Sequence, residues 1–426
     1  MRTRLATPTR TGWRFVSGAL RDALLEEAKR SSRLVPHHLA CVEGLRGLDA
    51  LRYAVDIGRH LLMADQLEEA VDLLLKQSTE WRAQSSVLRI LSMAEQAMRE
   101  AGIPFRDPRW GETWALRARL CIRSGRYDEG HLWATRAREA AREHGWPLVE
   151  TRAAIDLAVV ALHRRTGDGA ELAARALQLA EQAQDDSLHA TATYVWAASA
   201  MEARQFDLAR SQYELAMRRY EVLGNAVGRA DCLRDLGNLA LWTGDLDQAE
   251  QCYTQAVQLI ETEHSVMGRA HALNGLAEVK RKRGDLPGAE RGYRRALELF
   301  ERIGAGQATL ARLNLGLVLL AQKDWAAALG TLEGARDWLR DQGRDTWLGA
   351  SLATMLPAYA GLEDWVSFDR AAAQAYDLLT QTGFAQPDIL HQVECAWEMA
   401  REAGQVGCAE AAGRIVKHQA SLLGQS

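Results

Sequence analysis

Proline and cysteine are scarce in this chain. Eight of its 426 residues are proline, and none lies between Pro147 and Pro287. Folds rich in β-strands need many tight turns, in which proline is common, so this long gap favours helices. The six cysteines are scattered and no two have CxxC spacing, which argues against a disulfide framework. We expect reduced, partly buried thiols.

Long hydrophobic runs and a large excess of one charge are also absent. No segment approaches the ~18 consecutive apolar residues that a membrane helix requires. The basic segment Met1–Arg10 is not followed by an apolar stretch, so it does not resemble a secretory signal. The formal net charge of −4 gives no general attraction to nucleic acid or anionic lipid. We therefore expect a cytoplasmic protein that binds neither nucleic acid nor membrane directly.

The sequence contains none of the common short motifs of catalysis. It has no GxxxxGK[ST] phosphate loop, no GxSxG, no HExxH and no EF-hand pattern. His37 and His38 are adjacent on a predicted helix, so they do not face one site. His391 and Glu394 are spaced as a structural helix pair, although zinc binding with nearby cysteines is the alternative. We predict a non-enzymatic protein with no catalytic residues, no metal and no cofactor.

A short sequence segment recurs roughly every 40 residues, which is the signature of a repeat architecture. Gly244-Asp245 returns as Gly284-Asp285 and again as Lys323-Asp324. Further copies lie at Gly125, Arg204, Glu363 and Gly404, with an early one at Ala64. Apolar residues recur at helical spacing on both sides of each copy. The glycine can end the first helix in a left-handed cap and the aspartate can cap the second, so each copy predicts a helix–turn–helix unit.

These units resemble tetratricopeptide repeats of about 40 residues. The residues that carry the likeness are Leu236-Gly237, Gly244, Ala249, Tyr253 and Ala256. The likeness implies an all-α fold, a right-handed α-solenoid of stacked helix-turn-helix repeats. The likeness is strongest from about Ala190 to Asp345. The sequence departs from the family pattern at Phe368, which replaces a small alanine, and at Asp168-Gly169-Ala170. We assign about eight repeats to residues 111–426 and atypical helical repeats to residues 48–110.

Residues 1–47 follow a different pattern. The segment from Trp13 to Leu24, followed by Pro36-His37-His38, resembles the end of a winged-helix module in STAND-type multidomain signalling ATPases. Those proteins carry a nucleotide-binding core before this module and tetratricopeptide repeats after it. The likeness implies two or three helices between Trp13 and Leu45 and an association with a signalling ATPase or kinase module.

The candidate binding residues lie on the first helix of each repeat. Side chains that point away from the partner helix line the inside of a stacked solenoid. Asparagine can bond both groups of a peptide backbone, and tryptophan can anchor an interface. The predicted binding face comprises Tyr194, Arg234, Asn238, Trp242, Asn274, Glu278, Arg281 and Asn314. The alternative is that this face is a solvent-exposed surface that binds no partner. The basic stretch from Lys280 to Arg302 is a second candidate site, for phosphate or an acidic peptide.

The sequence favours an interaction scaffold. In this interpretation the solenoid binds a protein or peptide on its concave face and performs no chemistry. The alternative is a sensor or autoregulatory arm of a STAND-type signalling ATPase, kinase or transcription regulator.

Overall fold

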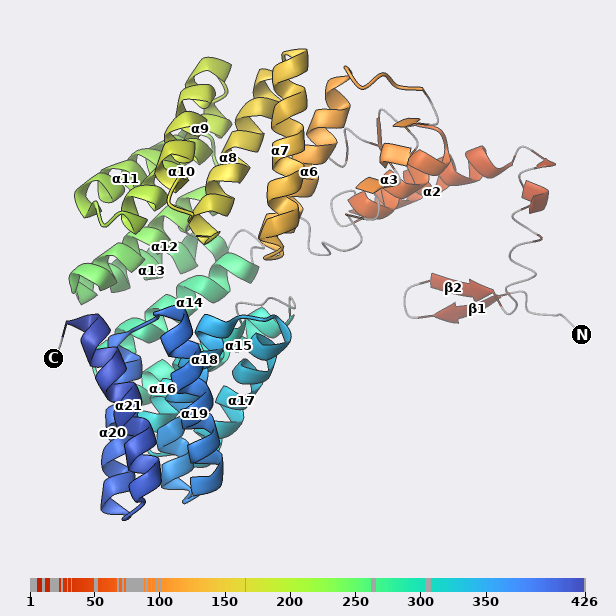
Figure 1. Cartoon of the computed structure of the whole chain (residues 1–426). Coiled ribbons are helices and arrows are strands. Elements are labelled where there is room, and N and C mark those ends of the chain that lie inside the picture. The colour runs from red at the N-terminus through yellow and green to blue at the C-terminus, as the bar shows by residue number, and fades with distance from the viewer. Residues whose placement is uncertain are drawn as a thin grey trace, which may run out of the picture. The chain divides into compact units, whose positions relative to one another are not determined.

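The computed structural model describes most of the chain from residue 102 onward. The described residues are 6–9, 12–15, 33–49, 53–66, 102–164, 166–261, 266–302 and 308–424, together with scattered positions between 23 and 31 and between 69 and 99. The chain divides into two compact units, Met1–Val195 and Trp196–Ser426. Within each unit, helices stack side by side (Figure 1).

From Pro108 onward the described residues form eight successive pairs of helices. Seven of the pairs have one copy of the repeated segment at their turn, and the pair α8–α9 has the divergent turn at Asp168. The pairs are α6 (Pro108–Arg123) with α7 (Tyr127–His144), α8 (Pro147–Arg164) with α9 (Gly169–Ala183), α10 (Asp186–Glu202) with α11 (Phe206–Val222), α12 (Ala226–Thr243) with α13 (Leu246–Glu261), α14 (Val266–Lys282) with α15 (Leu286–Arg302), α16 (Ala308–Ala321) with α17 (Trp325–Asp341), α18 (Asp345–Gly361) with α19 (Trp365–Thr382), and α20 (Pro387–Glu402) with α21 (Val406–Leu423). No strand occurs among the described residues of this region, which confirms the predicted all-α solenoid.

The predicted turns are confirmed in their backbone geometry. Gly125, Gly244 and Gly284 have φ angles of 76°, 84° and 84°, the left-handed conformation that only glycine adopts without strain. Arg204 and Lys323 hold the same conformation at φ 58° and 60° although they carry a Cβ. The residue after the turn caps the second helix where it is aspartate. The carboxylates that accept a backbone N–H bond in this way belong to Asp245, Asp285, Asp324 and Asp364.

Small residues and one tyrosine fix how the helix pairs stack. Ala249 and Ala289 are fully buried at the helix crossings, as their repeat position predicts. The buried ring of Tyr253 on α13 lies against Gly237 of α12, the first helix of its own pair. The same ring lies against Gly275 of α14, the first helix of the next pair. One side chain therefore links two successive pairs, and glycine on each neighbouring helix leaves room for it.

The N-terminal region contains strands as well as helices. β1 (Ala6–Thr9) and β2 (Gly12–Phe15) form an antiparallel hairpin in which Pro8 lies opposite Trp13. The prediction that residues 1–47 are a helical segment is wrong for these residues. The hairpin fits their alternation, because Trp13 and Phe15 are two residues apart, the period of a strand. Leu20 and Leu24, which belong to the segment expected to form helices, lie outside the described residues.

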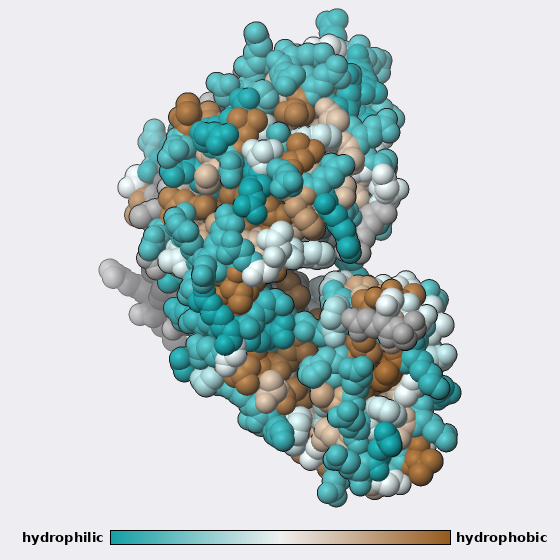
Figure 2. Space-filling model, turned by 90° about the vertical axis from the view of Figure 1, so that its left-hand side faces the viewer, coloured by the Kyte–Doolittle hydropathy of each residue, from teal (hydrophilic) through white to brown (hydrophobic). Residues whose placement is uncertain are grey.

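Of the helices between this hairpin and residue 102, α2 and α3 have bounds within the described residues. α2 (Leu34–Asp49) packs against α3 (Ala54–Met63) through the buried side chains of Val42, Ile57 and Leu61. None of the described helices is long and apolar enough to cross a membrane. On the face shown in Figure 2, hydrophilic residues predominate, and hydrophobic residues form separate areas between them.

Candidate functional site

The first helices of the second unit form one continuous row. α12, α14, α16, α18 and α20 each contact the next first helix along the row. Arg281, at the C-terminal end of α14, forms an ion pair of 3.1 Å with Asp388 at the start of α20. These residues are three helix pairs apart, so the surface that carries Arg281 curves towards α20. We call the side of α12, α14 and α16 that carries Asn238, Asn274 and Arg281 the inner face.

On α12 the inner face is a network of charged and amide groups. Arg234 pairs with Asp231 at 2.6 Å and with Asp235 at 2.9 Å. The Asn238 amide donates to Asp235 at 3.0 Å, and its carbonyl oxygen accepts a bond of 2.6 Å from the Tyr253 hydroxyl. The stacking tyrosine therefore fixes the orientation of an inner-face asparagine, because its ring is immobilised between two helices.

On α14 the same arrangement recurs with a carboxylate in place of the amide. The Tyr293 hydroxyl donates to Glu278, which also receives two bonds from Arg281, of 2.8 and 2.9 Å. Burial raises the pKa of the Glu278 carboxyl, but the bonds and charge of Arg281 outweigh it, and the pKa lies below its ordinary value. Glu278 is therefore ionised and Arg281 is held between two carboxylates.

Asn274 and His271 lie on α14, about one and two helical turns before Glu278. The side-chain oxygen of Asn274 is buried and has no hydrogen-bond partner among the described residues. A buried polar atom without a partner is costly, so a donor that reached this oxygen on binding would remove that cost. His271 packs edge-on against Phe300, with ring centroids 4.9 Å apart. Burial, followed by the charge of Arg234, lowers the pKa of His271 to about 4, so its ring is neutral at physiological pH.

The remaining predicted site residues take less central positions. Trp242 is 64% exposed and lies one helical turn beyond Asn238, against Phe206 and Arg204 of the preceding turn. It therefore stands at the edge of the inner face. Tyr194 is half-buried on α10 and Asn314 is half-buried on α16.

The basic stretch from Lys280 to Arg302 is largely neutralised by nearby carboxylates. Arg283 pairs with Asp247 and Glu250 of the preceding helix pair. Other arginines of this stretch pair within their own helix, Arg294 with Glu290 and Arg295 with Glu298. Such a surface has a weak net field, so it gives less support to a phosphate site than the sequence suggested.

Sequence reasoning named the amides and charges of this face but missed the residues that orient them. Tyr253 was named only as part of the repeat pattern, and Tyr293, Asp235 and Asp388 were not selected. The sequence contains one signal for the two tyrosines, because each follows its polar partner by the same number of residues. The contact with Asp388 has no such signal, since it depends on the curvature of three helix pairs.

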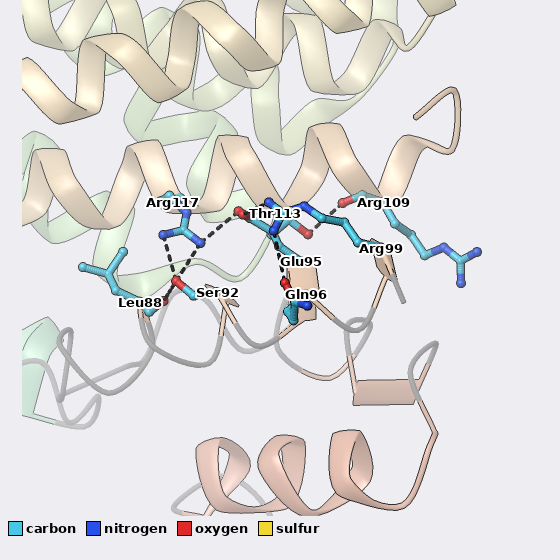
Figure 3. A network of polar contacts seen from close by, with 8 residues as sticks. All are labelled: Leu88, Ser92, Glu95, Gln96, Arg99, Arg109, Thr113 and Arg117. Atoms are coloured by element: carbon cyan, nitrogen blue, oxygen red, sulfur yellow. Dashed lines mark hydrogen bonds and ion pairs between the residues drawn. The ribbon is translucent and has the colours of Figure 1, made fainter. Parts of the chain in front are cut away.

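The first unit contains a separate polar cluster, shown in Figure 3. Arg117 on α6 donates to Glu95 at 2.9 Å and to Ser92, and it lies over the ring of Trp133 at 4.7 Å. Both members of the ion pair are buried, at 9% and 6% exposure. Beside them is a cavity of about 200 Å³ that also includes Cys121. Because each charge is matched by a direct partner, we interpret this cluster as the attachment of α6 to the preceding segment.

Histidines and cysteines do not gather into a metal centre in the described part of the chain. The Nδ1 atoms of His38 and His60 are 2.8 Å apart, so His38 pairs with α3, and its ring also contacts that of His37 edge-on. His391 lies 3.9 Å from the sulfur of Cys395. Burial lowers the pKa of both His38 and His60 and raises that of Cys395.

Comparison with known proteins identifies the repeat. A tetratricopeptide repeat family model matches residues 188–262 and 268–341. No curated protein matches the chain at a significant level. Among solved structures, the apo form of the quorum sensor NprR from B. thuringiensis has a TM-score of 0.51 and 16% identity, covering 83% of this chain and 99% of that one.

A second solved structure covers more of this chain. It is a Signal Transduction ATPase with Numerous Domains (STAND) protein with a tetratricopeptide repeat sensor, from Pyrococcus horikoshii. The TM-score is 0.53 at 14% identity, over 89% of this chain and 57% of that protein, so the chain spans little more than half of its length. The repeats within residues 188–262 and 268–341 therefore match tetratricopeptide repeats, and the two likenesses support the helical solenoid fold of the described residues.

Proposed function

We propose that this protein is a non-enzymatic scaffold that binds a protein or peptide on the inner face of its second unit. The observation that carries the proposal is the buried, unpartnered side-chain oxygen of Asn274, placed on a face where the neighbouring polar groups are already held in position. An extended peptide offers backbone N–H groups that can satisfy such an oxygen.

The fixed geometry of the neighbouring groups supports the same function. Tyr253 orients Asn238, and Glu278 and Asp388 hold Arg281. Side chains that are already ordered lose little conformational entropy on binding, so more of the contact energy becomes affinity. Charges of both signs on one face favour a partner in one defined orientation.

Affinity capture from the native cell with the full chain tests this proposal. The Trp242→Ala, Asn274→Ala double variant should lose the main captured partner, because it removes an exposed aromatic anchor and the free acceptor. The matched control is Val366→Ala with Arg295→Ala, two exposed side chains on second helices, which should retain the partner. Equal capture by both variants would place binding elsewhere on the molecule.

The second candidate function is a sensor or autoregulatory arm of a signalling ATPase or kinase. The similar fold of the STAND protein, which covers most of this chain, supports it. The distinguishing measurement is the nucleotide hydrolysis or kinase activity of the captured partner with and without this chain. A change in that activity supports the regulatory arm, and a captured partner without such activity supports the scaffold alone.

A further inference from the structure

The last helix pair reverses the places of a large ring and a glycine. In α12 and α13, glycine stands on the first helix and tyrosine on the second, as Gly237 and Tyr253. The same repeat positions in α20 and α21 carry Trp397 and Gly413. The contact between the two helices survives the exchange, because the indole nitrogen lies 3.4 Å from the place of a Cβ on Gly413. The large ring of the last pair therefore belongs to its first helix.

Because of this exchange, α21 carries no large side chain at the repeat position that tyrosine occupies in α13. In the interior, the ring of Tyr253 also contacts Gly275 on the first helix of the next pair. At α21 the tyrosine position is Gly413, and beside it lies a groove of about 1020 Å³ lined in part by Trp397, Val406 and Val416. Val406 is 69% exposed. In the interior, α13 is covered at this position by α14, the first helix of the next pair, so the groove on α21 lies where α14 packs on α13.

The charges around this groove favour a docked helix of complementary, negative charge. Arg401, Arg414 and Lys417 line it, opposed by Glu410 alone. In the described part of the chain none of these three cations forms an ion pair; Arg401 lies over Trp397 and Arg414 over Tyr376. Stacking the same face of a second copy on this one would bring the two sets of cations together. Carboxylates on the flanks of a docked helix would instead complement them.

We infer that the groove between α20 and α21 docks an amphipathic helix of a partner protein, with small and apolar residues on its contact face and carboxylates on its flanks. The helix stacks on the last pair as a further repeat would. This surface is distinct from the inner face, so it gives the protein a second point of attachment. Two separate sites on one scaffold would raise the effective concentration of one bound partner near the other.

A photo-reactive benzoylphenylalanine at position 406 of the full chain tests the inference in the native cell. The expected cross-link is to a segment of another protein with helical apolar spacing and flanking Asp or Glu. A synthetic peptide of that segment should bind the purified chain, and the Arg414→Glu, Lys417→Glu variant should weaken its binding at least ~10-fold. The control Arg370→Glu, an exposed charge on α19 outside the groove, should change the affinity less than ~2-fold.

Several results would overturn this assignment. They are no cross-link, a cross-link to a second copy of this chain, a cross-linked segment that is extended or basic, and peptide affinity unchanged by the charge reversal. A helical circular dichroism melt of each variant verifies that the fold is intact. The Trp242→Ala, Asn274→Ala variant should bind the peptide normally, which separates failure of this site from failure of the inner face.

Discussion

Replacing Gly275 by alanine tests the stacking geometry that supports the inner face. A Cβ at this position would lie 2.3 Å from Cε1 and 2.4 Å from Cζ of the Tyr253 ring. The ring is fully buried, and its contact with Gly237 on α12 restricts movement away from α14. Overpacking of this kind costs about 1–3 kcal/mol, while alanine gains ~0.5–1 kcal/mol over glycine in a helix. We expect Gly275→Ala to destabilise the protein by about 1–2 kcal/mol in net terms.

Gly330 on α17 is the matched control for this substitution. It also lies inside a helix, but no heavy atom lies within 4 Å of the place of its Cβ. Gly330→Ala should therefore stabilise by ~0.5–1 kcal/mol, from helix propensity alone. Urea unfolding followed by circular dichroism at pH 7 measures both changes. In a Tyr253→Ala background the cost of Gly275→Ala should vanish, because the clashing ring is gone. A Gly275→Ala protein as stable as Gly330→Ala would refute the reasoning.

Three further predictions concern the turns, the half-buried His271 and the inner face. Lys323→Gly should raise the free energy of unfolding by about 1 kcal/mol in urea, because Lys323 holds φ 60°, whereas Lys323→Ala should give no such gain. His271 binds its proton in the unfolded chain near pH 6.5 but in the folded protein only near pH 4, so stability falls as pH drops from 7 to 5. His271→Gln should abolish about 2 kcal/mol of that fall, and a pH series of urea melts with an unchanged slope would contradict it. The Trp242→Ala, Asn274→Ala protein should keep its thermal midpoint within ~2 °C while losing its partner in affinity capture, and a large drop in the midpoint would show that these side chains support the fold instead.

Local chemistry in the sequence determined the repeat and its turns. The left-handed residue and the capping aspartate lie next to each other in the chain, so Gly244-Asp245 could be recognised without a structure. The same is true of Ala249, because helical spacing alone places it on the face that meets the first helix. At Gly12–Phe15 the local signal was ambiguous, since four residues support either period, and the segment is a strand.

The orientation of the binding groups was decided only by the tertiary structure. The sequence placed Asn238, Asn274 and Arg281 on the outward side of first helices, because that side follows from the helical period. It could not show that Tyr253 bonds Asn238, that Asp388 reaches Arg281, or that His271 packs edge-on against Phe300. Each of these contacts joins residues on different helices, and the ion pair of Asp388 with Arg281 depends on curvature accumulated over three repeats. A small rotation between successive repeats sets that curvature, and no single repeat in the sequence carries it.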